Sequence, residues 1–309
     1  LGIRARDQLP PDLDLRTEIG AQFDTVFVAD DEELMQIPQF WTRYGLSHYL
    51  VKQLDRLVDI TGLDAWVLKL TDHTDYSDAD KQEIQRQIMD RYVGDYVSHW
   101  RNALNNLNIR KFADITEAID ALDAVLNNGQ PVWRSLLVLR DNTQAQLQMA
   151  IADPKAAVKN AQKEGNKASE LLNAAQKQTL EQMANQPEYQ LLNRIGRSFV
   201  EQKALVEHSE DQNGQLRQAY NALTAMNGEL HRVSNAPEPG KAALLLVQMR
   251  LQKNNPDAFF TAKQMSRNLS EPLGRWVGQF ADNSWDAVMK LALQSLEAEW
   301  SSKVVTPFL

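Results

Sequence analysis

Residues 78–107 read DADKQEIQRQIMDRYVGDYVSHWRNALNNL, and apolar side chains recur through them at helical spacing. The members of this stripe lie four residues apart, or three at the last step: Ile84, Ile88, Tyr92, Tyr96, Trp100, Leu104 and Leu107. Such a repeat puts one apolar face along a helix of about 45 Å, at 1.5 Å per residue. Ser77 suits the N-cap and Asp80 the first turn. We therefore predict one long amphipathic helix here.

Similar periods predict helices along most of the chain. The further ranges are 46–58, 115–127, 132–151, 189–206, 216–233, 240–252, 257–269, 271–280 and 285–304. Only QFDTVFV, residues 22–28, alternates roughly as a strand does, and a lone strand has no partner. We therefore predict an all-α fold, an irregular multi-helix bundle in two lobes.

The predicted lobe boundary lies in the polar residues 153–187, which are rich in Ala, Lys, Gln and Asn. A helix of this composition can bury only a narrow face. We expect a connecting helix or linker there. It would separate an N-terminal helical lobe, residues 1–152, from a C-terminal helical lobe, residues 188–309.

Composition excludes several classes of protein. The 309 residues are 43% hydrophobic and 24% charged, as in ordinary globular domains, and the absence of cysteine excludes disulfides and thiolate chemistry. A net charge of −8 argues against nucleic acid or an anionic membrane surface as a partner. The sequence contains no run of about 18 apolar residues, so we expect no direct contact of this segment with a membrane. The opening residues contain neither a signal-peptide core nor an initiator Met, so we expect a piece of a longer protein.

Sequence motifs for chemistry are absent. No two of the five histidines are four residues apart, and no phosphate-binding or nucleophile-elbow motif occurs. A metal at His73, within TDHTDYSDAD (71–80), is conceivable, but a solvated loop before a helix explains the acidic residues better. We assign no catalytic, cofactor-binding or metal residue and do not expect an enzyme. Gly274 and Gly278 predict close packing of two helices, and Trp100, Trp285 and Trp300 are expected in the core.

Residues 37–70, IPQFWTRYGLSHYLVKQLDRLVDITGLDAWVLKL, carry a recognisable pattern. It resembles the periplasmic helical region of the IcmF/TssM family, inner-membrane components of the type VI secretion system membrane complex. The residues that match the family signature are Pro38, Trp41, Thr42, Arg43, Gly45, Trp66, Tyr92, Asp95, Tyr96, Trp100, Pro272, Trp276 and Trp300. Gln130-Pro131-Val132 departs from the family's Ser-Pro-Leu block. We expect the signature residues to be structural, with Arg43 stacked on an aromatic neighbour.

This resemblance implies a structural role. The chain would be a periplasmic stalk segment of an inner-membrane-anchored protein, with the anchor outside this segment. Copies would associate into the trans-envelope complex that holds the contractile tail and lets its tube pass. Implied partners are other copies of itself, a small inner-membrane protein, and an outer-membrane lipoprotein bound mainly by a C-terminal β-domain that we expect to be absent from this segment. No cofactor is implied.

Two other classes of function stay open. The chain could be a soluble helical adaptor that binds another protein in a related IcmF-type transport system. An enzyme with an all-α core would be indicated by a metal or ligand bound near His73.

Overall fold

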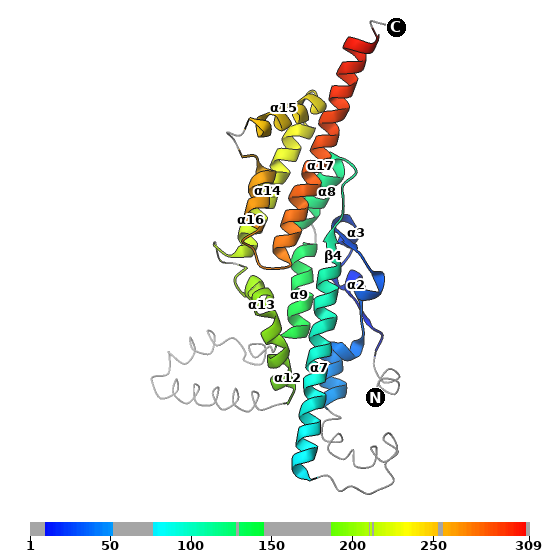
Figure 1. The fold of residues 1–309 in the computed structure, drawn as a ribbon, viewed down its shortest axis with the longest axis vertical. Coiled ribbons are helices and arrows are strands. Elements are labelled where there is room, and N and C mark those ends of the chain that lie inside the picture. Colours follow the sequence, from blue (N-terminus) through cyan, green and yellow to red (C-terminus); the bar gives the residue numbers. More distant parts are fainter. Residues whose placement is uncertain are drawn as a thin grey trace, which may run out of the picture. The chain divides into compact units, whose positions relative to one another are not determined.

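The computed structural model describes residues 10–51, 77–127, 130–144, 187–209, 211, 213–252 and 256–306 (Figure 1). The longer helices are α7 (Asp78–Asn106), α8 (Ile115–Leu126), α9 (Pro131–Thr143), α12 (Pro187–Gly196), α13 (Val200–Glu207), α14 (Gln215–Ser234), α15 (Pro239–Leu251), α16 (Ala258–Ser266) and α17 (Leu273–Trp300). The shorter helices are α2 (Leu15–Ile19), α3 (Phe23–Val26) and α4 (Arg43–Gly45), with 3₁₀ turns η1 (Glu32–Met35), η2 (Gln39–Trp41) and η6 (Arg197–Phe199) and π turns η3 (Leu46–Leu50) and η7 (Ser301–Val305). The strands are β1 (Leu13–Asp14), β2 (Phe27–Ala29), β3 (Gln36–Ile37) and β4 (Leu107–Ile109), paired β1 with β3 and β2 with β4.

The predicted all-α fold is confirmed for the described residues, where strands form only these two short ladders. The helices expected at 271–280 and 285–304 are one continuous helix, α17, followed by η7. The helix expected at 46–58 begins as η3, and its continuation lies outside the described residues. Trp66, His73 and the proposed connector 153–187, except for its last residue, also lie outside them.

The chain groups into two compact units, each built from segments far apart in sequence. Unit 1 takes residues 1–13, 37–101 and 139–200, and unit 2 takes residues 14–36, 102–138 and 201–309. Each unit has its own buried aromatic residues, Tyr96 and Trp100 in unit 1 and Trp276 and Phe280 in unit 2. The two units are therefore described separately below.

Helix α7 begins where the sequence predicts. The Ser77 Oγ accepts the Asp80 backbone N–H at 3.2 Å, and the Asp80 carboxylate accepts the Ser77 backbone N–H at 3.0 Å. This reciprocal capping satisfies two N–H groups that a helix start leaves without partners. Within the predicted stripe, Tyr92, Tyr96 and Trp100 are each at most 4% exposed.

Unit 2 is a bundle in which α17 packs against α8, α14, α15 and α16. Two glycines allow α16 to approach α17 closely. A Cβ atom on Gly274 would lie 2.7 Å from the carbonyl oxygens of Ser266 and Leu269, and one on Gly278 would lie 3.1 Å from the Ser266 Oγ. The close helix packing predicted from this glycine pair is confirmed.

The segment QFDTVFV is half helix and half strand. Phe23–Val26 form α3, and Phe27–Ala29 form β2, which pairs antiparallel with β4 in the register Phe27 to Ile109. The lone strand therefore has a partner, three residues that directly follow α7. The outer backbone of β4 is held by side chains of α17: Gln279 Oε1 accepts the Ile109 N–H at 2.9 Å, and Trp276 Nε1–H donates to the Leu107 oxygen at 2.8 Å.

Within the described ranges, none of the helices combines the length and the apolar content needed to cross a lipid bilayer.

Candidate functional site

The family signature of unit 1 forms an aromatic anchor, which we define as Phe40, Trp41, Tyr92, Tyr96 and Trp100. Three ring donors on α7, spaced four residues apart, each reach a backbone carbonyl. Tyr92 Oη–H donates to the Phe40 oxygen at 2.9 Å and Trp100 Nε1–H to the Trp41 oxygen at 2.8 Å. Tyr96 Oη–H donates to the Asn142 oxygen at 2.6 Å. One helix face thus holds both the signature turn and the end of α9.

The rings of the anchor pack on one another as well. Phe40 meets Tyr92 edge to face at a centroid distance of 5.2 Å, and Trp41 stacks on His99 at 5.1 Å. Burial raises the pKa of Tyr92 and of Tyr96 above the usual tyrosine value. Both phenols therefore stay protonated and remain donors across the physiological pH range.

The Thr-Arg-x-Gly part of the signature shapes the turn before α4. Thr42 is buried, and its Oγ1–H donates to the Gln39 backbone oxygen at 2.8 Å. Thr42 Oγ1 in turn accepts the Gly45 N–H at 3.3 Å. A Cβ on Gly45 would lie 2.1 Å from the Gln39 oxygen and 2.8 Å from the Phe40 Cα. Only glycine allows the backbone of η2 and α4 to approach this closely.

Arg43 differs from the expectation of an aromatic stack. Its guanidinium Nε lies 3.9 Å from the Glu188 carboxylate, and its backbone N–H donates to Asn142 Oδ1 at 3.2 Å. Among the described residues, the cations that lie over aromatic rings are Arg16, Arg101 and Arg250. Arg43 therefore links the signature turn to α9 and α12 through polar contacts. The backbone N–H and the charged guanidinium of Arg43 make these connections, and stacking on an aromatic ring does not.

The remaining signature residues of unit 1 have lesser roles. Pro38 is the residue before η2 and starts that turn. Asp95 accepts a hydrogen bond from Arg91 Nε at 2.9 Å, an exposed pair of the kind that contributes little to stability.

The signature residues of unit 2 split between core and surface. Pro272 and Trp276 are buried, and the Trp276 ring meets Phe27 edge to face at a centroid distance of 5.1 Å. Trp300 is 62% exposed, so the expectation that it lies in the core is wrong. Trp285 is partly buried beside Phe259 and beneath the Arg250 guanidinium.

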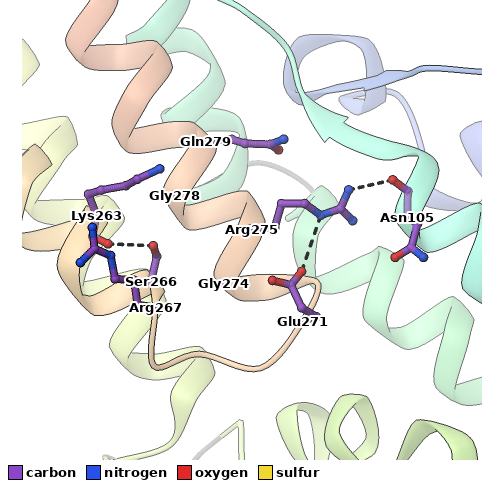
Figure 2. A pocket seen from close by; sticks show the side chains of 9 residues that line it. All are labelled: Asn105, Lys263, Ser266, Arg267, Glu271, Gly274, Arg275, Gly278 and Gln279. Atoms are coloured by element: carbon purple, nitrogen blue, oxygen red, sulfur yellow. Dashed lines mark hydrogen bonds and ion pairs between the residues drawn. The ribbon is translucent and has the colours of Figure 1, made fainter.

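A polar cleft of about 670 Å³ opens between α16, α17 and the end of α7. It is lined by Asn105, Lys263, Ser266, Arg267, Glu271, Gly274, Arg275, Gly278 and Gln279 (Figure 2). Arg275 extends towards Asn105 and Glu271, whereas Lys263, Ser266 and Arg267 lie on the α16 side (Figure 2). The lining therefore combines three basic side chains with one carboxylate.

Most of these charged side chains already form hydrogen bonds or ion pairs within unit 2. The Arg275 guanidinium donates to the Leu104 oxygen at 2.8 Å, the Asn105 oxygen at 2.7 Å and Asn108 Oδ1 at 3.1 Å. The Leu104 and Asn105 carbonyls belong to the last turn of α7, where a cation also suits the helix dipole. Lys263 pairs with Asp282. The cleft is thus chiefly the place where α17 caps α7.

The cleft does not resemble a catalytic site. Ser266 Oγ–H donates to the Lys263 backbone oxygen at 2.9 Å, so its hydroxyl proton points to an amide oxygen and not to a base. Throughout the part of the chain that the structure describes, no cluster of three His, Asp or Glu side chains is placed to hold a metal ion. The arrangement can support packing and polar recognition.

The surface of unit 2 carries an apolar face on α17. Met289, Leu293, Leu296 and Trp300 follow one another at spacings of four, three and four residues, and all are exposed. We call these four residues the α17 stripe. The neighbouring residues Ala287, Val288 and Ala292 are buried within the bundle. An exposed apolar row of this kind is typical of interaction surfaces.

The sequence alone missed the polar side of α17. Arg275, Gln279 and Asn283 are spaced four residues apart, and all three hold backbone or side-chain groups of residues 104–110. That spacing was a readable signal for a polar face on one helix, although nothing in it indicated the partner segment.

Comparison with known proteins places these observations in context. Residues 1–144 match the family model "IcmF-related: Intracellular multiplication and human macrophage-killing". No curated protein matches the chain. A solved structure described as "Type VI secretion system membrane core complex" is similar over 99% of this chain, with 16% sequence identity and a TM-score of 0.57. The chain spans about half of that protein, 51% of its length.

Proposed function

Given that the chain belongs to the IcmF/TssM family, with its family domain at residues 1–144, we propose that it is a structural segment of a type VI secretion membrane complex. It acts as the periplasmic stalk of an inner-membrane-anchored protein. Copies associate around an axis, hold the contractile tail and leave a path for its tube. Its work is mechanical and involves no catalysis in this segment.

The observation that carries this proposal is the fold likeness over 99% of the chain to a protein of such a core complex. The likeness includes both units, so the proposal does not depend on the family domain alone. A stalk also needs a stable turn-and-helix framework. The aromatic anchor supplies one, with three ring donors on α7 bonded to carbonyls of η2 and α9.

Partners follow from the same premise. We propose that the chain contacts other copies of itself and a small inner-membrane protein of the complex. Contact with the outer-membrane lipoprotein would run mainly through a β-domain outside residues 1–309. The division into lobes at residues 153–187 stays part of this proposal.

The proposal is tested with the full protein in cells that secrete. Two versions with different tags are expressed together, envelopes are solubilised, and one tag is purified. We expect the second tag to co-purify, and deletion of the gene to stop export of the tail-tube protein. Secretion that persists without the gene would reject the stalk. A protein found only as monomer with a soluble partner would favour the adaptor instead.

A further inference from the structure

The α17 stripe has the geometry of a helix–helix seam. Its spacing of four, three and four residues matches the alternation by which two helices pack along their length. Leu293 is 55% exposed and Trp300 is 62% exposed, so the seam is open in this chain. α15 covers another side of α17, where Gly240 lies against Ser295.

We infer that the occupant of this seam is α17 of a second copy, packed antiparallel. If the two helices cross between Leu293 and Leu296, Leu293 lies level with the partner's Leu296, and Met289 with the partner's Trp300. Both layers occur twice because the contact is two-fold symmetric. A thioether against an indole ring is a favourable layer.

Charge at the two ends of the stripe selects this direction. One turn before Met289 stands Asp286, and one turn after Trp300 stands Lys303, both exposed. Lys303 Nζ also lies 3.4 Å from the Glu299 carboxylate of its own chain, an exposed pair that contributes little to stability. In the antiparallel register Asp286 lies level with the partner's Lys303, so both ends of the seam carry an opposite-charge pair. In a parallel pair, Asp286 would face the partner's Asp286, and Lys303 the partner's Lys303. Like charges brought together at an interface are unfavourable.

The size of the seam sets the strength of the pairing. The stripe contributes four apolar residues from each copy, whereas a standard interface uses about 20–30 residues a side. Pairing should therefore be weak between free molecules and strong when other contacts hold copies together. Because the contact is isologous, it produces pairs, and a ring requires a second, head-to-tail surface. Copies anchored in the same membrane can pair antiparallel only where α17 runs across the membrane normal, so the inference includes that orientation of α17.

This inference rests on the proposed self-association and names one of its surfaces. The chain has no cysteine, so an introduced thiol is unique within it. Full protein is made with Leu293→Cys under one tag and Leu296→Cys under another, any cysteine outside residues 1–309 being replaced by serine. After mild oxidation of envelopes, we expect the mixed disulfide to exceed either same-site disulfide several-fold.

The matched control is Gln294→Cys, an exposed neighbour that lies off the stripe. It should give little cross-linking with either partner. Asp286→Lys should reduce the mixed disulfide several-fold, and Asp286→Lys combined with Lys303→Asp should restore it. These side chains are exposed, so the melting temperature of each variant should stay unchanged.

Three outcomes overturn the inference. Same-site disulfides in excess would show a parallel seam, and cross-linking at Gln294 equal to that at Leu293 would show random encounter. An absent mixed disulfide, while the two tags still co-purify, would reject the seam and leave the stalk intact. Failure of the two tags to co-purify from the protein without introduced cysteines would instead reject the proposed function itself.

Discussion

Gly45→Ala, compared with Gly94→Ala, tests the signature turn at atomic detail. Gly45 has φ −62°, a helical value that alanine adopts without strain, so conformation alone predicts no cost. The obstacle is space, since the new methyl would meet the Gln39 oxygen at 2.1 Å. Gly94 lies exposed within α7 and would meet nothing within 4 Å. The same chemical change should therefore have opposite signs at the two positions.

The magnitudes follow from these contacts. Forcing a methyl against backbone costs about 1–3 kcal/mol, and displacing Gln39 also disturbs the Thr42 hydrogen bond, worth about 1 kcal/mol. A helical Gly→Ala change gains about 0.5–1 kcal/mol. We expect a net loss of about 1–3 kcal/mol for Gly45→Ala and a gain of about 0.5–1 kcal/mol for Gly94→Ala.

Thermal melting followed by circular dichroism, with urea unfolding followed by tryptophan fluorescence, measures both changes. Gly45→Ala should melt roughly 3–10 °C below the wild type, and Gly94→Ala slightly above it. If Gly45→Ala proves as stable as Gly94→Ala, then η2 and α4 do not approach as closely as described. The structural role given to this glycine would then be wrong.

Three further variants test other contacts. Tyr96→Phe removes the donor to the Asn142 oxygen and should cost about 1–2 kcal/mol in urea unfolding, whereas an unchanged midpoint would show that water satisfies that oxygen. Arg275→Ala removes the cap of α7 and should cost about 1–3 kcal/mol; Arg275→Lys should recover only part of this, and full recovery would contradict the multiple contacts. Burial raises the pKa of Asp257, but hydrogen bonds from Arg250 and from backbone N–H groups together lower it by more, so the net pKa lies below that of an ordinary aspartate. The ionised Asp257 carboxylate therefore stabilises the fold above about pH 4, and this stabilisation is lost as the pH falls through the folded pKa. Asp257→Asn should reduce the fall in melting temperature that acid causes in the wild type. An identical fall in both proteins would refute this.

Periodicity predicted helices well and predicted their ends poorly. The spacing from Tyr92 to Trp100 reflects one buried face of α7, and burial at that spacing requires a helix. The same stripe continues to Leu107, which is buried although it belongs to β4. An apolar residue at position 107 fits both the helical spacing and a buried strand. The sequence therefore could not show where the helix ends and the strand begins.

Tertiary pairing explains the misjudged strand at residues 22–28. Phe27 pairs with Ile109, and these residues lie too far apart for local pattern to connect them. Propensity could suggest that Phe27 and Val28 are extended. It could not reveal that the three residues after α7 would provide the opposite strand.

Trp300 shows a second limit of sequence patterns. Its place on the stripe of α17 correctly identifies an apolar face, but a period does not state what covers that face. The core prediction assumed the same chain, and 62% of Trp300 is exposed. For the signature turn the sequence indicated a structural role. It could not show why Gly45 is required, which is that a Cβ atom there would lie 2.1 Å from the Gln39 backbone oxygen.

The three ring donors of α7 have a consequence for a chain under load. Tyr92, Tyr96 and Trp100 reach their carbonyls sideways from one helix face. A pull along the axis of α7 would strain the three bonds in parallel, as in shear, and they would have to break together. Bonds peeled one after another yield at lower force. Unit 1 would therefore resist tension along this helix better than tension applied across it.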